Sequence, residues 1–267
     1  MNVFLREVRA YRKSTIIWVA SLSALVIVFM VGMYPAFSQD VEASKKLLSQ
    51  LPEAVRVAFN VQLSNFFTVY GFYGYLLGFA SVAGAIMAMN LGTGVISKEV
   101  SGKTADFLLS KPITRPKVVS AKLAAAFVAI VFTSAVFSVV AYVSALVAST
   151  GPVSASTFFV LSSTFFLVQA LFLVLGALFA VLIPKVRSVV SVTLPTVFGL
   201  YIIGTLGEVL GQTKVRYLSP FRYFDTGYII KNVSLESSYV ILEAVLVVVA
   251  IVAIYLIYLR KDIRAAA

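Results

Sequence analysis

Long stretches without any charged residue are the feature of this sequence that most restricts its fold. Lysine, arginine, aspartate and glutamate are all missing from residues 14–39, 57–97, 123–184, 188–207 and 244–259. Crossing the roughly 30 Å hydrocarbon core of a bilayer takes about 20 mostly apolar residues in a helix. Residues 123–184 are long enough for two crossings joined by a turn. The pattern therefore predicts a polytopic membrane protein.

The composition agrees with this prediction and excludes several other classes. Hydrophobic residues make up 60% of the chain and charged residues only 12%, whereas soluble domains carry about 25% charged residues. The chain has no cysteine and no histidine, so it lacks the thiolate metal ligand, the imidazole ligand and the commonest general base. The formal charge of +11 does not indicate a nucleic-acid partner, because the basic residues flank apolar segments instead of forming one soluble face.

The hydropathy pattern places six transmembrane helices in a single transmembrane domain, residues 1–267. A turn cluster from Ser149 to Pro152 separates the third span from the fourth, since a continuous helix would not carry it. The predicted fold class is therefore an all-α polytopic membrane protein. Its spans are residues 14–34, 70–96, 118–148, 157–183, 189–210 and 239–259.

The distribution of basic residues predicts the orientation, because lysine and arginine accumulate on the cytoplasmic side. With the N-terminus inside, fifteen of the 22 basic residues lie in inner segments, and the net charge is +11 inside and zero outside. Both termini are then cytoplasmic. A cleaved signal peptide is the alternative at the N-terminus, but the apolar run is long for a signal core and no clear Ala-x-Ala site follows it. The inner basic residues are Arg6, Arg9, Arg12, Lys13, Lys98, Lys103, Lys111, Arg115, Lys117, Lys122, Lys185, Arg187, Arg260, Lys261 and Arg264.

Two segments flanking the first span are predicted to form helices at the membrane surface. In residues 1–13, Phe4, Val8 and Tyr11 recur at helical spacing among basic residues, which is typical of an amphipathic interfacial helix; a frayed basic tail is the alternative. The outer segment, residues 35–66, has apolar residues at helical spacing, and Pro52 is positioned to start a short helix. We expect one or two helices there.

The inner connection, residues 97–117, carries the most specific pattern. Gly102-Lys103-Thr104 resembles the end of a Walker A loop, but the first glycine of that motif is replaced by Ser97 and no strand precedes it. The segment instead predicts a short amphipathic helix over residues 104–110 that Pro112 ends. Phe107, Leu108 and Leu109 would form an apolar knob on a cytoplasmic loop, and such a knob requires a partner groove.

This connection resembles that of a known family. The resemblance is to the membrane-spanning permease subunit of ATP-binding-cassette (ABC) transporters of the type-two permease family, and it covers nearly the whole chain. It extends to the basic N-terminus, the outer segment Leu51-Pro-Glu-Ala-Val, and the outer stretch Leu218-Ser-Pro-Phe-Arg-Tyr-Phe. One departure from the family pattern is the basic and acidic pair Arg222 and Asp225 after Ser219-Pro220, whose role is not assigned by the resemblance. The residues that carry the inner pattern are Glu99, Gly102, Thr104, Leu108, Leu109, Pro112 and Arg115, and together with Phe107 they are the expected ATPase-coupling residues.

The resemblance implies a partner motor. ATP and Mg²⁺ would bind two copies of a separate cytoplasmic ABC ATPase, with no cofactor on this chain. A second permease chain, identical or different, would complete the complex in the plasma membrane of a bacterium or archaeon. The short inner helix would be the coupling helix that docks in a groove of the ATPase. Transport would then follow from rigid-body alternating access, with a hydrophobic or amphipathic substrate exported.

Candidate residues for the substrate path are polar or aromatic residues within the spans: Asn90, Gln169, Glu208, Tyr70 and Tyr73. Polar groups inside a membrane are costly and often functional, but Asn90 and Gln169 could equally form hydrogen bonds between packed helices. Glu208 could simply lie at the interface, and the aromatic residues could face lipid. Glycines along the second span, including Gly78, Gly84 and Gly92, favour close helix packing.

Two other functional classes compete with a permease. An ion-coupled secondary transporter or channel usually has a carboxylate or ion pair near the middle of the bilayer, and the sequence places none there. A membrane-embedded enzyme would need polar catalytic groups in a cavity, which the missing histidine and cysteine disfavour.

Overall fold

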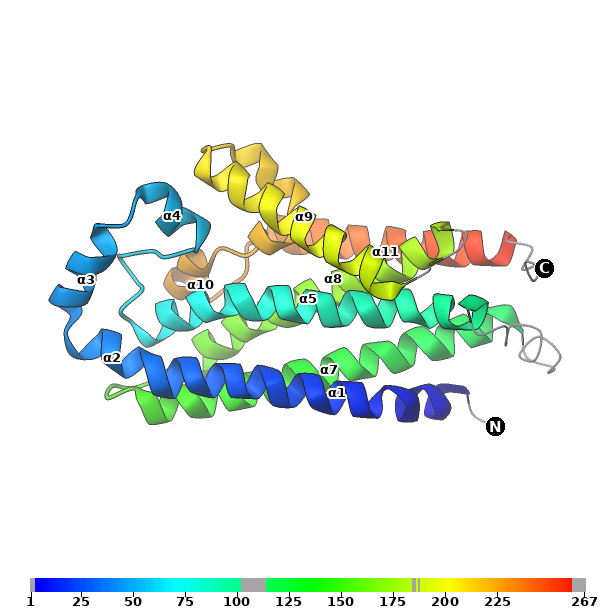
Figure 1. Cartoon of the computed structure of the whole chain (residues 1–267), viewed down its shortest axis with the longest axis horizontal. Helices are drawn as coiled ribbons and strands as arrows, with labels where there is room; N and C mark the ends of the chain where they lie inside the picture. Colours follow the sequence, from blue (N-terminus) through cyan, green and yellow to red (C-terminus); the bar gives the residue numbers. More distant parts are fainter. Residues whose placement is uncertain (1–2, 102–113, 184–185, 187, 261–267) are drawn as a thin grey trace.

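The computed structural model describes residues 3–101, 114–183, 186 and 188–260, and its long helices run along one common axis (Figure 1). Within these residues six helical stretches are long and apolar enough to cross a membrane, and there is no strand. The predicted all-α fold with six spans is therefore confirmed. The six stretches are Val3–Gln39, Val69–Val95, Pro116–Ala148, Ala155–Leu182, Val189–Val209 and Ser237–Leu259.

Short elements connect the long helices. In chain order the described elements are α1 (Val3–Ile27), the π-helix η1 (Val28–Met33), α2 (Tyr34–Gln39), α3 (Val41–Ser49), α4 (Glu53–Ala58), α5 (Val69–Ser101), α7 (Arg115–Ala148), α8 (Ala155–Leu182), α9 (Val189–Val209), the 3₁₀ helices η2 (Thr213–Leu218) and η3 (Pro220–Arg222), α10 (Thr226–Asn232) and α11 (Ser237–Arg260).

The N-terminal segment differs from the separate interfacial helix that its amphipathic pattern suggests. Helix α1 continues from Val3 into the first span without a break. Tyr11 is buried, and Phe4 and Val8 pack against the same hydrophobic cluster, so the apolar face covers protein instead of lipid headgroups. The basic residues of the segment remain exposed on the other face.

A π-helical turn, η1, lies within the last part of the first spanning stretch. In a regular helix the N–H of residue 35 would donate to the carbonyl of residue 31, but Pro35 has no N–H and its ring crowds that carbonyl. The backbone widens instead, and the N–H of Tyr34 donates to the carbonyl of Phe29, five residues back. Helix α2 then starts with the proline in its first turn, where the missing donor costs nothing.

Two short helices, α3 and α4, follow the first spanning stretch, which includes α2, and this agrees with the expected one or two helices. Asp40 caps α3 by accepting from the backbone N–H of Ala43 at 3.0 Å. Pro52 precedes α4 as predicted and lies at its N-cap position. Helix α4 packs against α9, so this segment contacts a distant part of the chain.

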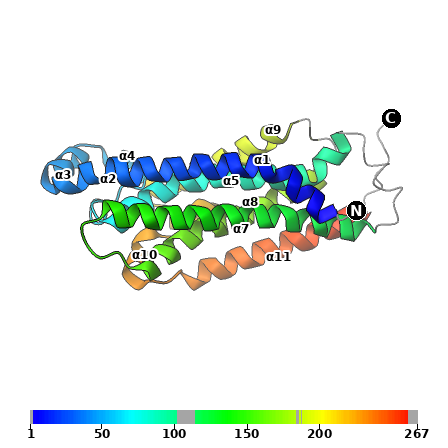
Figure 2. The ribbon, with the colours of Figure 1, turned by 90° about the horizontal axis from the view of Figure 1, so that it is seen from below.

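The two ends of the bundle carry different elements. The start of α1, the end of α5, the start of α7 and the end of α11 lie at one end, here called the terminal end, on the right of Figure 1. Helices α2, α3 and α10 lie at the opposite, distal end (Figures 1 and 2). This arrangement agrees with an even number of spans. The compartment that each end faces stays a prediction.

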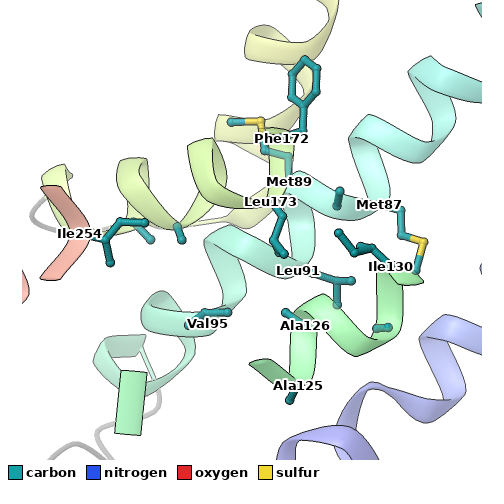
Figure 3. Packing of buried hydrophobic residues seen from close by; sticks show 14 of the residues in the cluster. Met87, Met89, Leu91, Val95, Ala125, Ala126, Ile130, Phe172, Leu173 and Ile254 are labelled. Carbon is teal, nitrogen blue, oxygen red and sulfur yellow. The ribbon is translucent and has the colours of Figure 1, made fainter. Parts of the chain in front are cut away.

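Helices α5 and α8 form the centre of the bundle. In their most apolar windows 67% and 61% of the residues are buried, against 17% for α9 and α11, so the last two helices are peripheral. A large cluster of buried side chains from α5, α7, α8 and α11 fills the middle (Figure 3). It includes Met87, Met89, Ile130, Phe172 and Leu173.

Two glycines allow α5 and α8 to approach each other closely. A Cβ added to Gly92 would lie 2.0 Å from the backbone oxygen of Leu173, and one added to Gly176 would lie 2.4 Å from that of Met89. Neither distance is possible for real atoms, so any side chain at these positions forces the helices apart. The predicted role of span-two glycines in close packing is confirmed at Gly92, whereas a Cβ added to Gly78 would have no atom within 4 Å.

Candidate functional site

The predicted coupling segment lies mostly outside the described residues. Glu99 belongs to the last turn of α5, and Arg115 is the first residue of α7. The other six predicted coupling residues, Gly102, Thr104, Phe107, Leu108, Leu109 and Pro112, fall in residues 102–113, outside the described part of the chain. The coupling helix therefore stays a prediction, but the two helices that flank it are placed.

A buried lysine ties these two helices together near the terminal end. Lys122 of α7 is 3% exposed, and its Nζ donates to the backbone oxygen of Val95 in α5 at 2.7 Å. A hydrogen bond from a charged donor is stronger than a neutral one. This bond thus joins the two helices that flank residues 102–113 in the sequence.

A cavity of about 290 Å³ lies at the distal end of the bundle. Its walls combine charges of both signs, small polar groups, aromatic rings and the bare backbone of three glycines. A smaller cavity of about 60 Å³ shares part of this lining and continues along α5 and α8. The large cavity is lined by Asn60, Gly204, Gly207, Glu208, Gly211, Gln212, Thr213, Arg216, Phe221, Arg222, Phe224, Asp225, Thr226 and Tyr239.

Arg216 of η2 holds one wall of this distal cavity in place. Its Nε donates to the backbone oxygen of Arg222 at 2.7 Å and one Nη donates to that of Tyr223 at 3.0 Å. The same guanidinium forms an ion pair with Glu236 and lies 4.0 Å above the ring of Tyr239, a cation–π contact. One side chain therefore connects η2, η3 and the start of α11.

The structure gives roles to the residues that the family resemblance left open. Arg222 forms an ion pair with Glu208 of α9 and donates to the hydroxyl of Thr205 at 3.2 Å. Asp225 caps α10, because its Oδ1 accepts from the backbone N–H of Tyr228 at 2.6 Å. Arg222 thus joins η3 to α9 on one side of the cavity. Asp225 caps α10, and the first residue of that helix, Thr226, also lines the cavity.

Tyr223 is a buried residue of this polar network, and its side chain acts as a neutral hydrogen-bond donor. Burial raises the pKa of Tyr223 to about 12, and the nearby Glu243 and Tyr239 act in the same direction. Its hydroxyl donates to the backbone oxygen of Tyr217 at 2.9 Å. Its ring stacks on that of Tyr239 with centroids 5.7 Å apart. Tyr239 lines the cavity and Tyr223 is buried, and the two stacked rings are here called the tyrosine layer.

A comparison with protein families decides what kind of membrane protein this is. A family model described as ABC-2 family transporter protein matches residues 1–263, almost the entire chain. The chain belongs to the ABC-2 transporter family. A search of curated proteins found no match. As an ABC-2 permease, the chain is a multi-pass membrane component, and membership in this family implies association with an ABC ATPase.

The substrate-path candidates of the ABC-2 permease lie in different surroundings. Glu208 lines the distal cavity, whereas Gln169 and Tyr73 are fully buried. Gln169 accepts from Ser134 of α7 at 2.6 Å, and the hydroxyl of Tyr73 lies 2.7 Å from that of Ser162 in α8. Both contacts join neighbouring helices. In this conformation the two side chains serve helix packing, and a place on the substrate path stays a prediction.

The remaining two candidates also lie apart from the cavity. The hydroxyl of Tyr70 accepts from the backbone N–H of Ser154 at 2.6 Å, which joins the start of α5 to the N-cap of α8. Asn90 has a buried Oδ1 with no hydrogen-bond partner among the described residues. Of the five predicted path residues, only Glu208 meets charged partners at a cavity.

Glu243 of the ABC-2 permease is a residue that the sequence pattern did not single out. Glu243 directly precedes the charge-free stretch 244–259, so in the sequence it looks like an ordinary acidic residue at the end of a span. The structure buries it within α11, at 3% exposure. Its position four residues after Tyr239 was the available signal, since that spacing puts both side chains on one helix face. No group of three or more metal-ligating residues occurs within the described residues.

Proposed function

We propose that this ABC-2 permease is the membrane half of an exporter for a hydrophobic or amphipathic substrate, driven by two copies of a cytoplasmic ABC ATPase. The observation that carries the proposal is the family match over residues 1–263 together with six spans. ATP and Mg²⁺ bind the ATPase and not this chain. A second permease chain completes the complex in the plasma membrane of a bacterium or archaeon.

The mechanism that we propose is a rigid transfer of movement from the ATPase to the distal end. ATP-driven closure of the ATPase pair moves the segment between α5 and α7. The bond between Lys122 and the carbonyl of Val95 makes these helices move together, and the close crossing at Gly92 and Gly176 passes the movement to α8. Packed cores transmit such displacements because they have few voids to absorb them.

The mixed lining of the distal cavity supports an amphipathic substrate. Charged groups line the large cavity, and the smaller cavity beside it is lined by residues such as Leu77, Phe79 and Val168. A molecule with a polar head and an apolar body matches both regions, since each part finds surroundings of its own polarity.

Copurification of the tagged full chain from its native membrane tests the function. We expect a nucleotide-binding subunit to elute with the permease in equal amounts. Transport that runs on an ion gradient alone, by a permease that elutes without any such subunit, would overturn the proposal and favour a secondary transporter.

Single-cysteine labelling tests the orientation, and the absence of native cysteine makes the background clean. Thr150 and Lys117 are both exposed and lie near opposite ends of α7. We expect a membrane-impermeant maleimide added to intact cells to label Thr150→Cys and to leave Lys117→Cys unlabelled until the cells are opened. The reverse pattern would place the coupling segment outside the cell, where no ATPase could reach it.

A further inference from the structure

The buried face of α11 contains one acidic residue. Tyr239, Ala250, Ile254 and Tyr258 are buried along this peripheral helix, and their spacing places them on a single stripe. Glu243 lies on the same stripe, one turn after Tyr239. Figure 2 shows α11 along one flank of the bundle, and α8 is the helix it packs against most. The carboxyl group of Glu243 therefore points into protein.

Neither carboxylate oxygen of Glu243 has a hydrogen-bond partner among the described residues. The other two acidic side chains near the distal cavity differ, because Glu208 is paired with Arg222 and Glu236 with Arg216.

The buried cluster that contains Tyr239, one turn before Glu243, is built from three elements. Helix α8 contributes apolar residues to the cluster at this level, including Leu171 and Val174. The titratable groups are Tyr223 after η3 and Tyr239 on α11 itself. Arg216 is a cation of the adjoining polar network, but it lies on the ring of Tyr239 and its guanidinium is engaged by Glu236 and two backbone oxygens. Among the described residues of this network, no positive group is thus free to compensate a charge on Glu243.

An ionised carboxylate in such a place is very unfavourable, since burying an unpaired charge is costly and the group neutralises instead. Binding a proton removes the charge of the carboxylate and requires no additional space in the packed interior. Glu243 is absent from the residues that line the distal cavity, but Tyr239, one turn away, belongs to that lining. Tyr239 thus forms part of the cavity wall one turn from Glu243, and Glu243 itself does not reach the cavity.

We propose that Glu243 is a proton-binding site of this permease. The carboxyl group carries a proton while the tyrosine layer is closed. When the layer opens toward the distal cavity, the proton passes to water there, and the resulting carboxylate pairs with Arg216. Occupancy of the site by a proton thus favours the closed arrangement of the distal end. This proposal does not depend on the identity of the transported substrate.

Infrared spectroscopy of the purified full chain in detergent tests the proposal without any transport assay. The carbonyl stretch of a protonated carboxylic acid is separate from the bands of carboxylates and of the backbone. At neutral pH we expect this band in the wild type and in Glu208→Gln, whose carboxylate is paired with Arg222, and we expect it to be lost in Glu243→Gln. Glutamine has the shape of the protonated acid, so this variant keeps the fold.

Two outcomes would overturn the proposal. One is the absence of a protonated-acid band from the wild type at neutral pH, a result that requires no variant at all. The other is a band that persists in Glu243→Gln. The role of the tyrosine layer has its own readout: in Tyr239→Ala the band should disappear at a pH lower by roughly one unit or more, because water then reaches the acid. An unchanged pH range in that variant would exclude the layer as the barrier.

Discussion

Replacing Gly92 by alanine is expected to lower the free energy of unfolding by about 3 kcal/mol, the upper end for overpacking of a core. The added Cβ would lie 2.0 Å from the backbone oxygen of Leu173, and a backbone atom of a neighbouring helix cannot rotate away as a side chain can. Gly176→Ala meets the backbone oxygen of Met89 from the other side and should have a similar effect. Thermal unfolding of the purified protein in detergent measures both.

Gly78→Ala is the matched control for this experiment. Gly78 lies on the same helix, α5, and nothing lies within 4 Å of the position its Cβ would take. Alanine should therefore be neutral there, or stabilising by up to about 1 kcal/mol because of its higher helix propensity. Equal melting temperatures for Gly92→Ala and Gly78→Ala would contradict the close crossing of α5 and α8.

Replacing Phe107 and Leu108 together by aspartate should abolish ATP-driven transport while membrane insertion continues. The physical reason is the cost of placing two charges against the apolar groove of the ATPase in which we propose that this segment docks. At about 2 kcal/mol or more for each unpaired charge, binding of the ATPase should weaken by roughly 1,000-fold. The measurements are copurification of the ATPase and stimulation of its activity by the permease, with surface labelling of Thr150→Cys to verify insertion.

The pair Ser149→Asp and Thr150→Asp controls for the added charge. It introduces the same two carboxylates at the distal end of α7, and there we expect ATPase binding and transport to remain near the wild-type level. Normal ATPase stimulation by Phe107→Asp/Leu108→Asp would show that this segment is not the coupling helix, although the family membership would stand.

The spans and their breaks were predictable because they depend on local properties of the chain. Residues 123–184 contain no charge, and the turn cluster from Ser149 to Pro152 divides them; the structure ends α7 at Ala148 and begins α8 at Ala155. Pro52 restricts only the backbone next to it, and it lies at the N-cap of α4, where a helix start was predicted. Hydropathy and turn chemistry need no knowledge of what lies elsewhere in the fold.

The partners of individual side chains were not predictable in the same way. The segment 1–13 has an amphipathic pattern that suits a membrane surface and a protein surface equally, and only the packing of Phe4 and Val8 on the core distinguishes them. Arg222 had no assigned role until α9 brought Glu208 beside it. Gln169 was a candidate for a substrate path, and its contact with Ser134 depends on how α7 and α8 pack.

The order of residues along the chain is enough to establish a helical membrane protein with six spans, because the hydrocarbon core excludes charge over a fixed thickness. The pairing of polar groups, in contrast, is visible only once the helices are packed together. Glu243 and Glu236 are both acidic residues near the start of α11, yet Glu236 lies beside Arg216 and Glu243 has no partner among the described residues. Pairing depends on contacts between elements distant in sequence, and hydropathy along one segment carries no information about them.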